Sequence, residues 1–191
     1  MPNCKRTTLL IFMSLLVSVA TETHARKTGP LRSEPLDMIV IHSTGGPTCD
    51  AKTGKPVWVR AGSMEENMRH IEAHPKLGIH YMIDRDGALR ASVPEDRVAY
   101  HVYTYSGRSI AIELINDGDG IDPFPPAQLD ALVTLLKDIV ARRGIKREGI
   151  KRHSDLDRGM MSCDRSKRRK VDPGEAFPFG TALDRVFARQ P

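Results

Sequence analysis

The sequence has few aromatic residues, few cysteines and no apolar run long enough to span a membrane. Aromatic residues make up 5% of its 191 residues, and no stripe of basic and aromatic residues suggests a nucleic-acid surface. Its longest apolar run, residues 9–20, is shorter than the roughly 20 residues that a membrane-spanning helix needs. With 40% hydrophobic and 28% charged residues, the composition excludes extended disorder and is typical of one globular domain.

The N-terminus has the pattern of a secretory signal peptide. Lys5 and Arg6 precede the apolar run, which ends in small residues. We therefore predict a signal peptide at residues 1–20, with an alternative cleavage site after Ala25. A permanent membrane anchor is the alternative, and the short run disfavours it. Because Cys4 precedes the run, a newly exposed N-terminal cysteine would not be available for lipid attachment.

The remainder is expected to form a leader and one catalytic domain. Residues 21–35 lack periodicity and contain glycine and proline, which predicts a flexible leader before a domain at residues 36–191. Loss of Lys5 and Arg6 with the signal peptide lowers the formal net charge from +5 to +3. We expect a periplasmic or secreted monomer without a stable membrane anchor or a nucleic-acid partner.

Apolar patterns predict alternating strands and helices. Strands are expected at residues 38–41, 79–83, 88–93, 98–102, 109–115 and 150–153. Helices are expected at residues 63–74, 125–144 and 180–188, a hairpin turn at residues 84–87, and a long loop at residues 49–62. This mixture predicts an α/β fold with a central mixed β-sheet flanked by helices.

Three side chains that can bind a metal follow predicted strands or lie in the loop beyond one. His42 ends the first strand, His153 ends the last strand, and Asp172 lies in the following loop. A histidine at a strand end is, taken alone, more often a polar rim residue than a ligand. A rigid sheet can nevertheless present several such side chains to one point.

Six sequence blocks, in order, carry a resemblance to a known family. They are IVIHST (39–44), GIHYMIDRDG (78–87), AYH (99–101), SIAIEL (109–114), RHSD (152–155) and KVDPG (170–174). The pattern resembles the type 2 N-acetylmuramoyl-L-alanine amidases, which include AmpD-like amidases, phage amidases and animal peptidoglycan recognition proteins. The resemblance covers about residues 36–179.

This resemblance implies a zinc-dependent hydrolase of peptidoglycan, acting on the amide between the lactyl group of N-acetylmuramic acid and L-alanine during cell-wall turnover or remodelling. It implies that zinc is bound by His42, His153 and Asp172, leaving one position open. Glu113 would transfer the proton of the attacking water, and Lys170 would stabilise the oxyanion. The alternatives are a salt-bridged strand residue for Glu113 and a member of the basic run 167–170 for Lys170.

Other histidines have less definite roles. Blocks matching His80 and His101 lie near the cleft in similar amidases, so either residue would support the sheet or touch substrate, and a structural role is favoured for His80. His70 and His74 share one helical face and are taken as surface residues. Some relatives have a catalytic tyrosine where this chain has Ile79, which favours the Glu113 type of site.

Two cysteines would remain after signal cleavage. Cys49 follows His42 and Cys163 follows His153 at similar distances, so both loops should flank one cleft. We predict a disulfide between them, with two free thiols as the alternative. An insertion at residues 160–169 is longer and more basic than expected for the family. Its run at residues 167–170 would be a solvated loop or would attract an anionic wall polymer.

Two other functions are compatible with the same residues. A peptidoglycan-binding module without catalysis usually lacks one or more metal ligands, whereas all three are present here. A zinc peptidase that cuts within the stem peptide would use the same chemistry, and only the resemblance favours the sugar–peptide bond.

Overall fold

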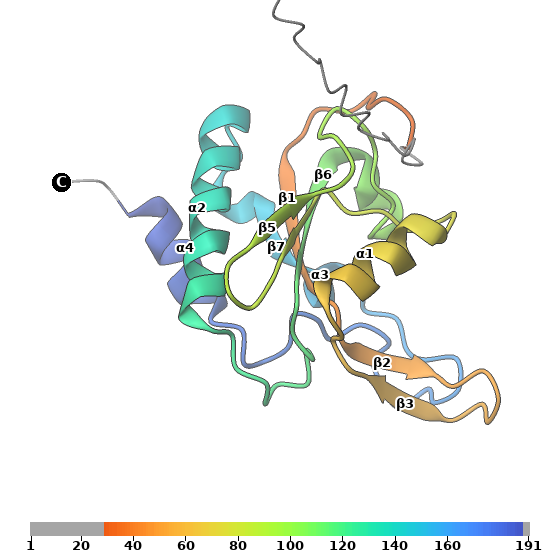
Figure 1. Cartoon of the computed structure of the whole chain (residues 1–191). Coiled ribbons are helices and arrows are strands. Elements are labelled where there is room, and N and C mark those ends of the chain that lie inside the picture. Colours follow the sequence, from red (N-terminus) through yellow and green to blue (C-terminus); the bar gives the residue numbers. More distant parts are fainter. Residues whose placement is uncertain (1–28, 189–191) are drawn as a thin grey trace, which may run out of the picture.

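The computed structural model describes residues 29–188. The predicted signal peptide, its alternative cleavage site and residues 21–28 of the leader lie outside the described residues. Figure 1 shows a central sheet between helices, which confirms the predicted fold class. Within the described range, no helix is long and apolar enough to cross a membrane.

The central sheet has five strands in the order β5-β4-β6-β1-β7. Their bounds are β1 (Met38–Ser43), β4 (Tyr81–Ile83), β5 (Leu89–Ala91), β6 (Ser109–Leu114) and β7 (Ile150–Arg152). Strands β4, β6, β1 and β7 are parallel, and β5 pairs antiparallel to β4 at one edge. The sheet is therefore mixed, with β1 and β6 at its buried centre.

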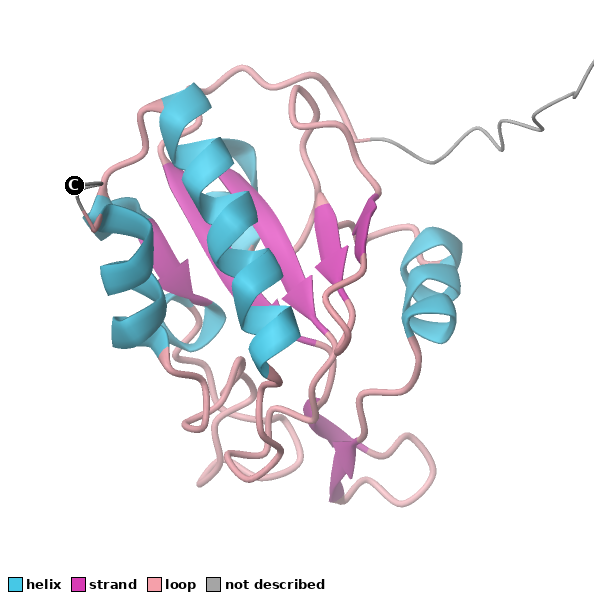
Figure 2. Cartoon of the chain, turned by 60° about the vertical axis from the view of Figure 1, so that its left-hand side comes forward, coloured by secondary structure: helices cyan, strands magenta, loops and turns pink. Residues whose placement is uncertain are grey.

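Helices cover both faces of the sheet. Figure 2 shows α2 (Pro126–Arg143) and α4 (Phe179–Phe187) lying together in front of one face. The helix α1 (Met64–Ala73) lies on the other side, as does the 3₁₀ helix η1 (Tyr103–Arg108) (Figure 1). Two short elements, η2 (Arg147–Gly149) and α3 (His153–Leu156), flank β7.

Alternation along the strands divides the core into two layers. Odd-numbered positions of β1, such as Ile39 and Ile41, pack with Leu132 and Leu136 of α2 in the larger cluster. Even-numbered positions face the other layer, where Val40 packs with other buried side chains. Because side chains of a strand alternate between its faces, the next even-numbered residue of β1 points away from α2.

Local signals set the ends of the two best-predicted helices. Ser63 and Glu66 form a reciprocal capping box at the start of α1, as predicted. Helix α2 has Pro126 in its first turn, and it ends where Gly144 adopts the left-handed conformation (φ 68°). The predicted hairpin turn at residues 84–87 joins β4 to β5, and Gly87 takes a positive φ of 89°.

Two secondary-structure predictions are wrong. Residues 49–62 are not one long loop, because β2 (Gly46–Cys49) and β3 (Pro56–Val59) form an antiparallel hairpin. This hairpin lies outside the central sheet, so its strands lack the apolar alternation of a buried strand. Residues 98–102 form no strand, because Val98 pairs through its backbone N–H with the carbonyl of Pro30 instead of with the sheet.

The described end of the predicted leader is anchored to the domain. The Arg32 guanidinium donates hydrogen bonds to the carbonyls of Glu95, Ser106, Gly107 and Ser109 at 2.7–3.1 Å. Arg32 also donates its backbone N–H to the carbonyl of Asp96. From Gly29 onward, therefore, this segment is part of the folded domain and is not a free leader.

Candidate functional site

The central strands place two functional side chains on one face of the sheet. In the parallel pair β1–β6, Val40 lies opposite Ala111, and His42 lies opposite Glu113. Because paired residues of parallel strands point to the same face, His42 and Glu113 leave the sheet together, away from α2. Glu113 is the one residue of β6 that is not fully buried, because its side chain reaches a cleft.

His42, His153 and Asp172 bring three potential ligand atoms together. His42 Nδ1 lies 3.0 Å from His153 Nδ1 and 3.2 Å from Asp172 Oδ2, and His153 Nδ1 lies 2.9 Å from the same oxygen. All three residues are buried. The polypeptide brings them together because His153 begins α3 directly after β7, and the N–H of Ser154 donates to the carbonyl of Asp172.

The electrostatics of this cluster suit a bound cation. Burial, together with the neighbouring His153, lowers the pKa of His42 to about 4, so its ring is neutral at pH 7. Burial alone would raise the pKa of Asp172, but its close contacts with His153 and His42 hold it well below its ordinary value. A neutral imidazole and an ionised carboxylate are the forms that bind metal.

The pKa of Glu113 is shifted in the opposite direction from the pKa of Asp172. Burial, together with the negative charge of Asp172, raises the pKa of Glu113 to about 8, although the positive charge of Lys170 partly opposes the shift. A carboxyl group with a pKa near neutral pH can accept and return a proton during a reaction. Glu113 forms no salt bridge among the described residues, which removes the alternative of a salt-bridged strand residue.

These side chains open into a cleft of about 500 Å³. Its floor holds His42, Glu113, His153, Lys170 and Asp172. A second cavity of about 710 Å³ shares His153 and Lys170 with it and continues past the exposed Tyr103. The two spaces therefore adjoin each other beside the buried cluster.

Several cleft residues were not assigned to the site from the sequence, and three of them are polar or aromatic side chains from α1 and the loop before η1. Asn67 and His70 reach the cleft from α1, and Tyr100 reaches it from the loop before η1. His70 is exposed, as predicted, but it also lines the cleft, whereas His74 lines only the two neighbouring cavities. Asn67 and His70 are three residues apart and so lie on one face of α1, a spacing that could have indicated a shared role. The sequence did not show which face of α1 would turn to the cleft.

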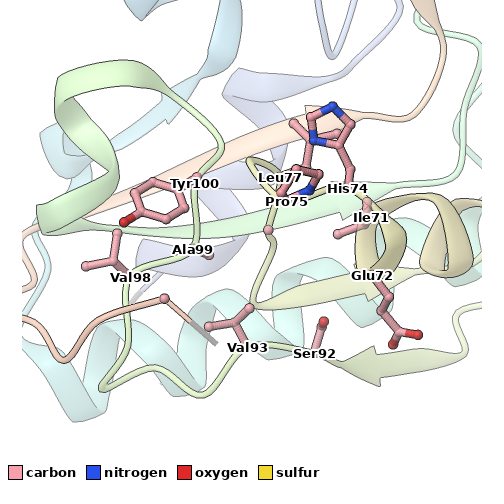
Figure 3. A pocket seen from close by; sticks show the side chains of 12 residues that line it. Ile71, Glu72, His74, Pro75, Leu77, Ser92, Val93, Val98, Ala99 and Tyr100 are labelled. Carbon is pink, nitrogen blue, oxygen red and sulfur yellow. The ribbon is translucent and has the colours of Figure 1, made fainter. Parts of the chain in front are cut away.

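Figure 3 shows a smaller cavity beside this cleft, with Ile71, Leu77 and Tyr100 among its labelled side chains. Its volume of about 90 Å³ has room for little more than a few water molecules. The three residues named also line the main cleft, so the two spaces share a wall.

The structure separates the roles of His80 and His101. His80 is completely buried, and its ring contacts the backbone N–H of Ala111 and the carbonyl of Arg97. It lines neither of the described cavities that contain residues of the cluster, so it lies against the sheet and away from the cleft. His101 lines both cavities, and its Nδ1 lies 2.9 Å from Nε2 of His42.

Most of the basic run at residues 167–170 is engaged within its own loop. Lys167 pairs with Asp164, Arg168 donates to backbone carbonyls, and Arg169 pairs with Asp157 while its guanidinium covers the ring of Tyr103. Lys170 alone of the four forms no such ion pair or hydrogen bond in the described part of the chain, and it lines the cleft. The first three side chains are therefore held within the loop, and Arg169 also lines the cleft.

Cys49 and Cys163 are joined by a disulfide in the structure. The bond connects the β2–β3 hairpin to the segment that leads to Lys170 and Asp172, so it links two walls of the cleft. A closed loop of more than a hundred residues strongly restricts the unfolded chain.

We predict that replacing both cysteines with alanine lowers the free energy of unfolding by up to about 4–5 kcal/mol, since the loop-closure entropy is lost. Urea unfolding of the exported wild type and of the double variant measures the difference. Reducing agent should destabilise the wild type and leave the variant unchanged. Free alkylation of both thiols in unreduced protein from the periplasm would contradict the disulfide itself.

The family model that describes N-acetylmuramoyl-L-alanine amidases matches residues 32–175. The chain belongs to this family. Among curated amidases, AmiD of Escherichia coli K12 is 38% identical over 102 residues, which cover 46% of this chain and 34% of AmiD. The AmpD protein of Enterobacter cloacae, a 1,6-anhydro-N-acetylmuramyl-L-alanine amidase, is 34% identical over 115 residues, which cover 56% of each protein. This chain therefore spans about a third and about half of these two amidases.

A solved amidase structure has the same fold. Escherichia coli AmiD in complex with the substrate anhydro-N-acetylmuramic acid-L-Ala-D-γ-Glu-L-Lys aligns with a TM-score of 0.62 and 25% sequence identity. The alignment covers 90% of this chain and 63% of the AmiD chain. The match between family and fold agrees with the resemblance seen in the sequence blocks.

Proposed function

We propose that this protein is a zinc-dependent N-acetylmuramoyl-L-alanine amidase that cleaves the amide between the lactyl group of N-acetylmuramic acid and L-alanine. The observation that carries the proposal is the convergence of His42, His153 and Asp172 on one point beside Glu113, at the floor of an open cleft. Family membership supports the choice of bond, and the ligand of the AmiD structure supports a muropeptide as the substrate class.

The donor set fits zinc. Two imidazole nitrogens and one carboxylate oxygen are a common set for a hydrolytic zinc site that keeps a position open. The three atoms are 2.9–3.2 Å apart and buried, which is close to the separation of neighbouring ligands around a small tetrahedral cation. Zinc bound there would supply Lewis acidity, which makes water more acidic and polarises an amide carbonyl.

The chain's own residues would manage protons and charge around the scissile amide. Glu113 would take a proton from the attacking water and then give it to the departing amine of L-alanine. Lys170 would face the oxyanion that develops as the carbonyl is attacked. Ile79 also lines the cleft, but its aliphatic side chain cannot transfer a proton. Proton transfer is therefore assigned to Glu113.

We predict that Lys170→Ala lowers kcat about 100-fold or more, because a cation beside the oxyanion is lost. Zinc content and substrate affinity should change little. Lys167→Ala is a matched control, since Lys167 lies in the same loop but pairs with Asp164 and does not line the cleft. Steady-state kinetics on a soluble muropeptide measure both variants, and equal activity of the two would remove Lys170 from the mechanism.

Digestion of purified muropeptides, followed by mass spectrometry, tests the proposed bond. We expect intact stem peptides that begin with L-alanine, together with peptide-free sugars. Shortened stems that remain attached to muramic acid would instead identify a peptidase. Binding without any product, in protein that contains zinc, would identify a recognition module.

We also propose that the protein works in the periplasm or outside the cell during cell-wall turnover or remodelling. The peptidoglycan substrate class supports this location, as does a disulfide that connects two walls of the cleft, because disulfides persist in oxidising compartments. Fractionation of cells that produce the full chain should recover the shortened, exported form outside the cytoplasm.

A further inference from the structure

A row of hydrogen bonds connects a backbone carbonyl to the far side of the His42 ring. The Ser109 hydroxyl lies 2.6 Å from the carbonyl oxygen of Tyr105. His101 Nε2 lies 3.0 Å from Ser109 Oγ, and His101 Nδ1 lies 2.9 Å from His42 Nε2. Ser109 is completely buried and His42 almost so, and the half-buried ring of His101 lies between them.

The hydrogen bond between Ser109 and the carbonyl of Tyr105 determines which group donates in each of the other hydrogen bonds. A carbonyl oxygen can only accept, so the single hydroxyl proton of Ser109 is donated to Tyr105. The Ser109 oxygen must then accept from His101, which therefore carries its proton on Nε2.

The same reasoning continues to the cluster. With its proton on Nε2, a neutral His101 ring has a lone pair on Nδ1, so it accepts from Nε2–H of His42. The remaining lone pair of His42 is then on Nδ1. That atom is the one that faces His153 and Asp172.

We propose that His101 and Ser109 are positioning residues that hold His42 in its Nε2–H tautomer and so present Nδ1 as a ligand. This inference rests on the proposed zinc site. The opposite tautomer would direct an N–H group at the cation, and the ring would have to exchange its proton before binding. Partners of this kind fix both the tautomer and the orientation of a ligating histidine.

The surroundings of His101 support a positioning role. The backbone N–H groups of His101 and Val102 both donate to the hydroxyl of the buried Ser106, which fixes the backbone that carries the ring. The rings of His42 and His101 meet edge to face, with centroids 5.0 Å apart. Both ring nitrogens of His101 are engaged within the protein, so only its ring surface is available to a substrate.

Zinc affinity and histidine tautomers provide the test. We expect His101→Leu to weaken zinc binding roughly 10- to 100-fold, as measured by competition with a chromophoric chelator. Ser109→Ala should weaken it less, and His101→Asn should restore part of the loss because its side-chain oxygen can accept from His42. Ser43→Ala is the matched control, because the buried Ser43 hydroxyl follows His42 directly yet has no hydrogen-bond partner among the described residues.

The tautomer is measured independently in the metal-free mature protein, through long-range ¹H–¹⁵N spectra of the histidine rings. The wild type should show His42 protonated on Nε2, and Ser109→Ala should add signal from the Nδ1–H form. A wild-type His42 protonated on Nδ1 would overturn the inference, as would folded His101→Leu and Ser109→Ala variants that bind zinc as tightly as the wild type. If the wild type failed to bind zinc, the proposed metal centre would be wrong. The measured tautomer of His42 would still show whether His101 and Ser109 position its ring.

Discussion

Replacing Glu113 with glutamine is expected to lower kcat by about 10²- to 10⁴-fold, while zinc content and substrate affinity stay close to wild type. Glutamine keeps the size of the side chain but cannot accept the proton of the attacking water. Glu113 is not among the three residues whose ligand atoms converge, so its loss should leave metal binding intact. Kinetics on a soluble muropeptide and zinc analysis of the same preparations measure the two effects separately.

The pH profile provides a second readout of the same substitution. Burial raises the pKa of Glu113 to about 8 in the protein without metal, so the base form increases as pH rises through that value. A nearby cation favours the carboxylate, so the rising limb of kcat in the loaded enzyme should lie below pH 8. Glu113→Gln should lack this limb, whereas the exposed Glu148→Gln should keep both the limb and the rate. Substantial activity of Glu113→Gln with full zinc content would require another base.

The second large effect is expected from His153→Ala, which should lose zinc and activity together. His153 contributes one of the three atoms of the buried cluster, and its removal leaves only His42 and Asp172 to hold the ion. Activity should fall to the background of the digestion assay, and added zinc should not restore it. Metal analysis of the purified variant, together with the same assay, measures both losses.

Chelation separates loss of metal from damage to the fold. Wild-type protein stripped by a chelator should lose activity and recover it when zinc is added back, whereas His153→Ala should not recover. His74→Ala is a useful control, since His74 is exposed and lies outside the cluster. A stripped wild type that retained full activity would exclude a metal-dependent reaction.

Much of the fold could be predicted because its central elements bury regular apolar patterns. Strands β1 and β6 and helix α2 form the main core. Their apolar residues therefore follow the patterns expected of buried strands and of one helical face. The β2–β3 hairpin could not be found in this way, since Val57, Trp58 and Val59 are partly exposed and belong to no core cluster. Residues 98–102 resemble a strand because Ala99 and Val102 are buried, yet the partner of Val98 lies in the distant segment near Pro30.

The site was predictable to a different degree for each kind of residue. His42, His153 and Asp172 could be named because they lie in recognisable blocks at the ends of strands, and the structure brings them together. The hydrogen bond between Ser109 and His101 could not be predicted, because it depends on how the loop at His101 folds back toward β6. Such contacts join residues through the folding of a loop, so no periodic pattern in the sequence predicts them.

The pairing of His42 with Glu113 across β1 and β6 limits how this protein can change during evolution. A deletion of one residue early in either strand would turn His42 or Glu113 into the helix-covered layer and bring the next residue, Ser43 or Leu114, into its place at the cleft. Insertions in these strands are therefore expected to abolish activity, whereas insertions at the hairpin tip near Gly54 or in the segment around Asp164 should be tolerated. New substrate preferences can arise in those walls while the reaction itself remains unchanged.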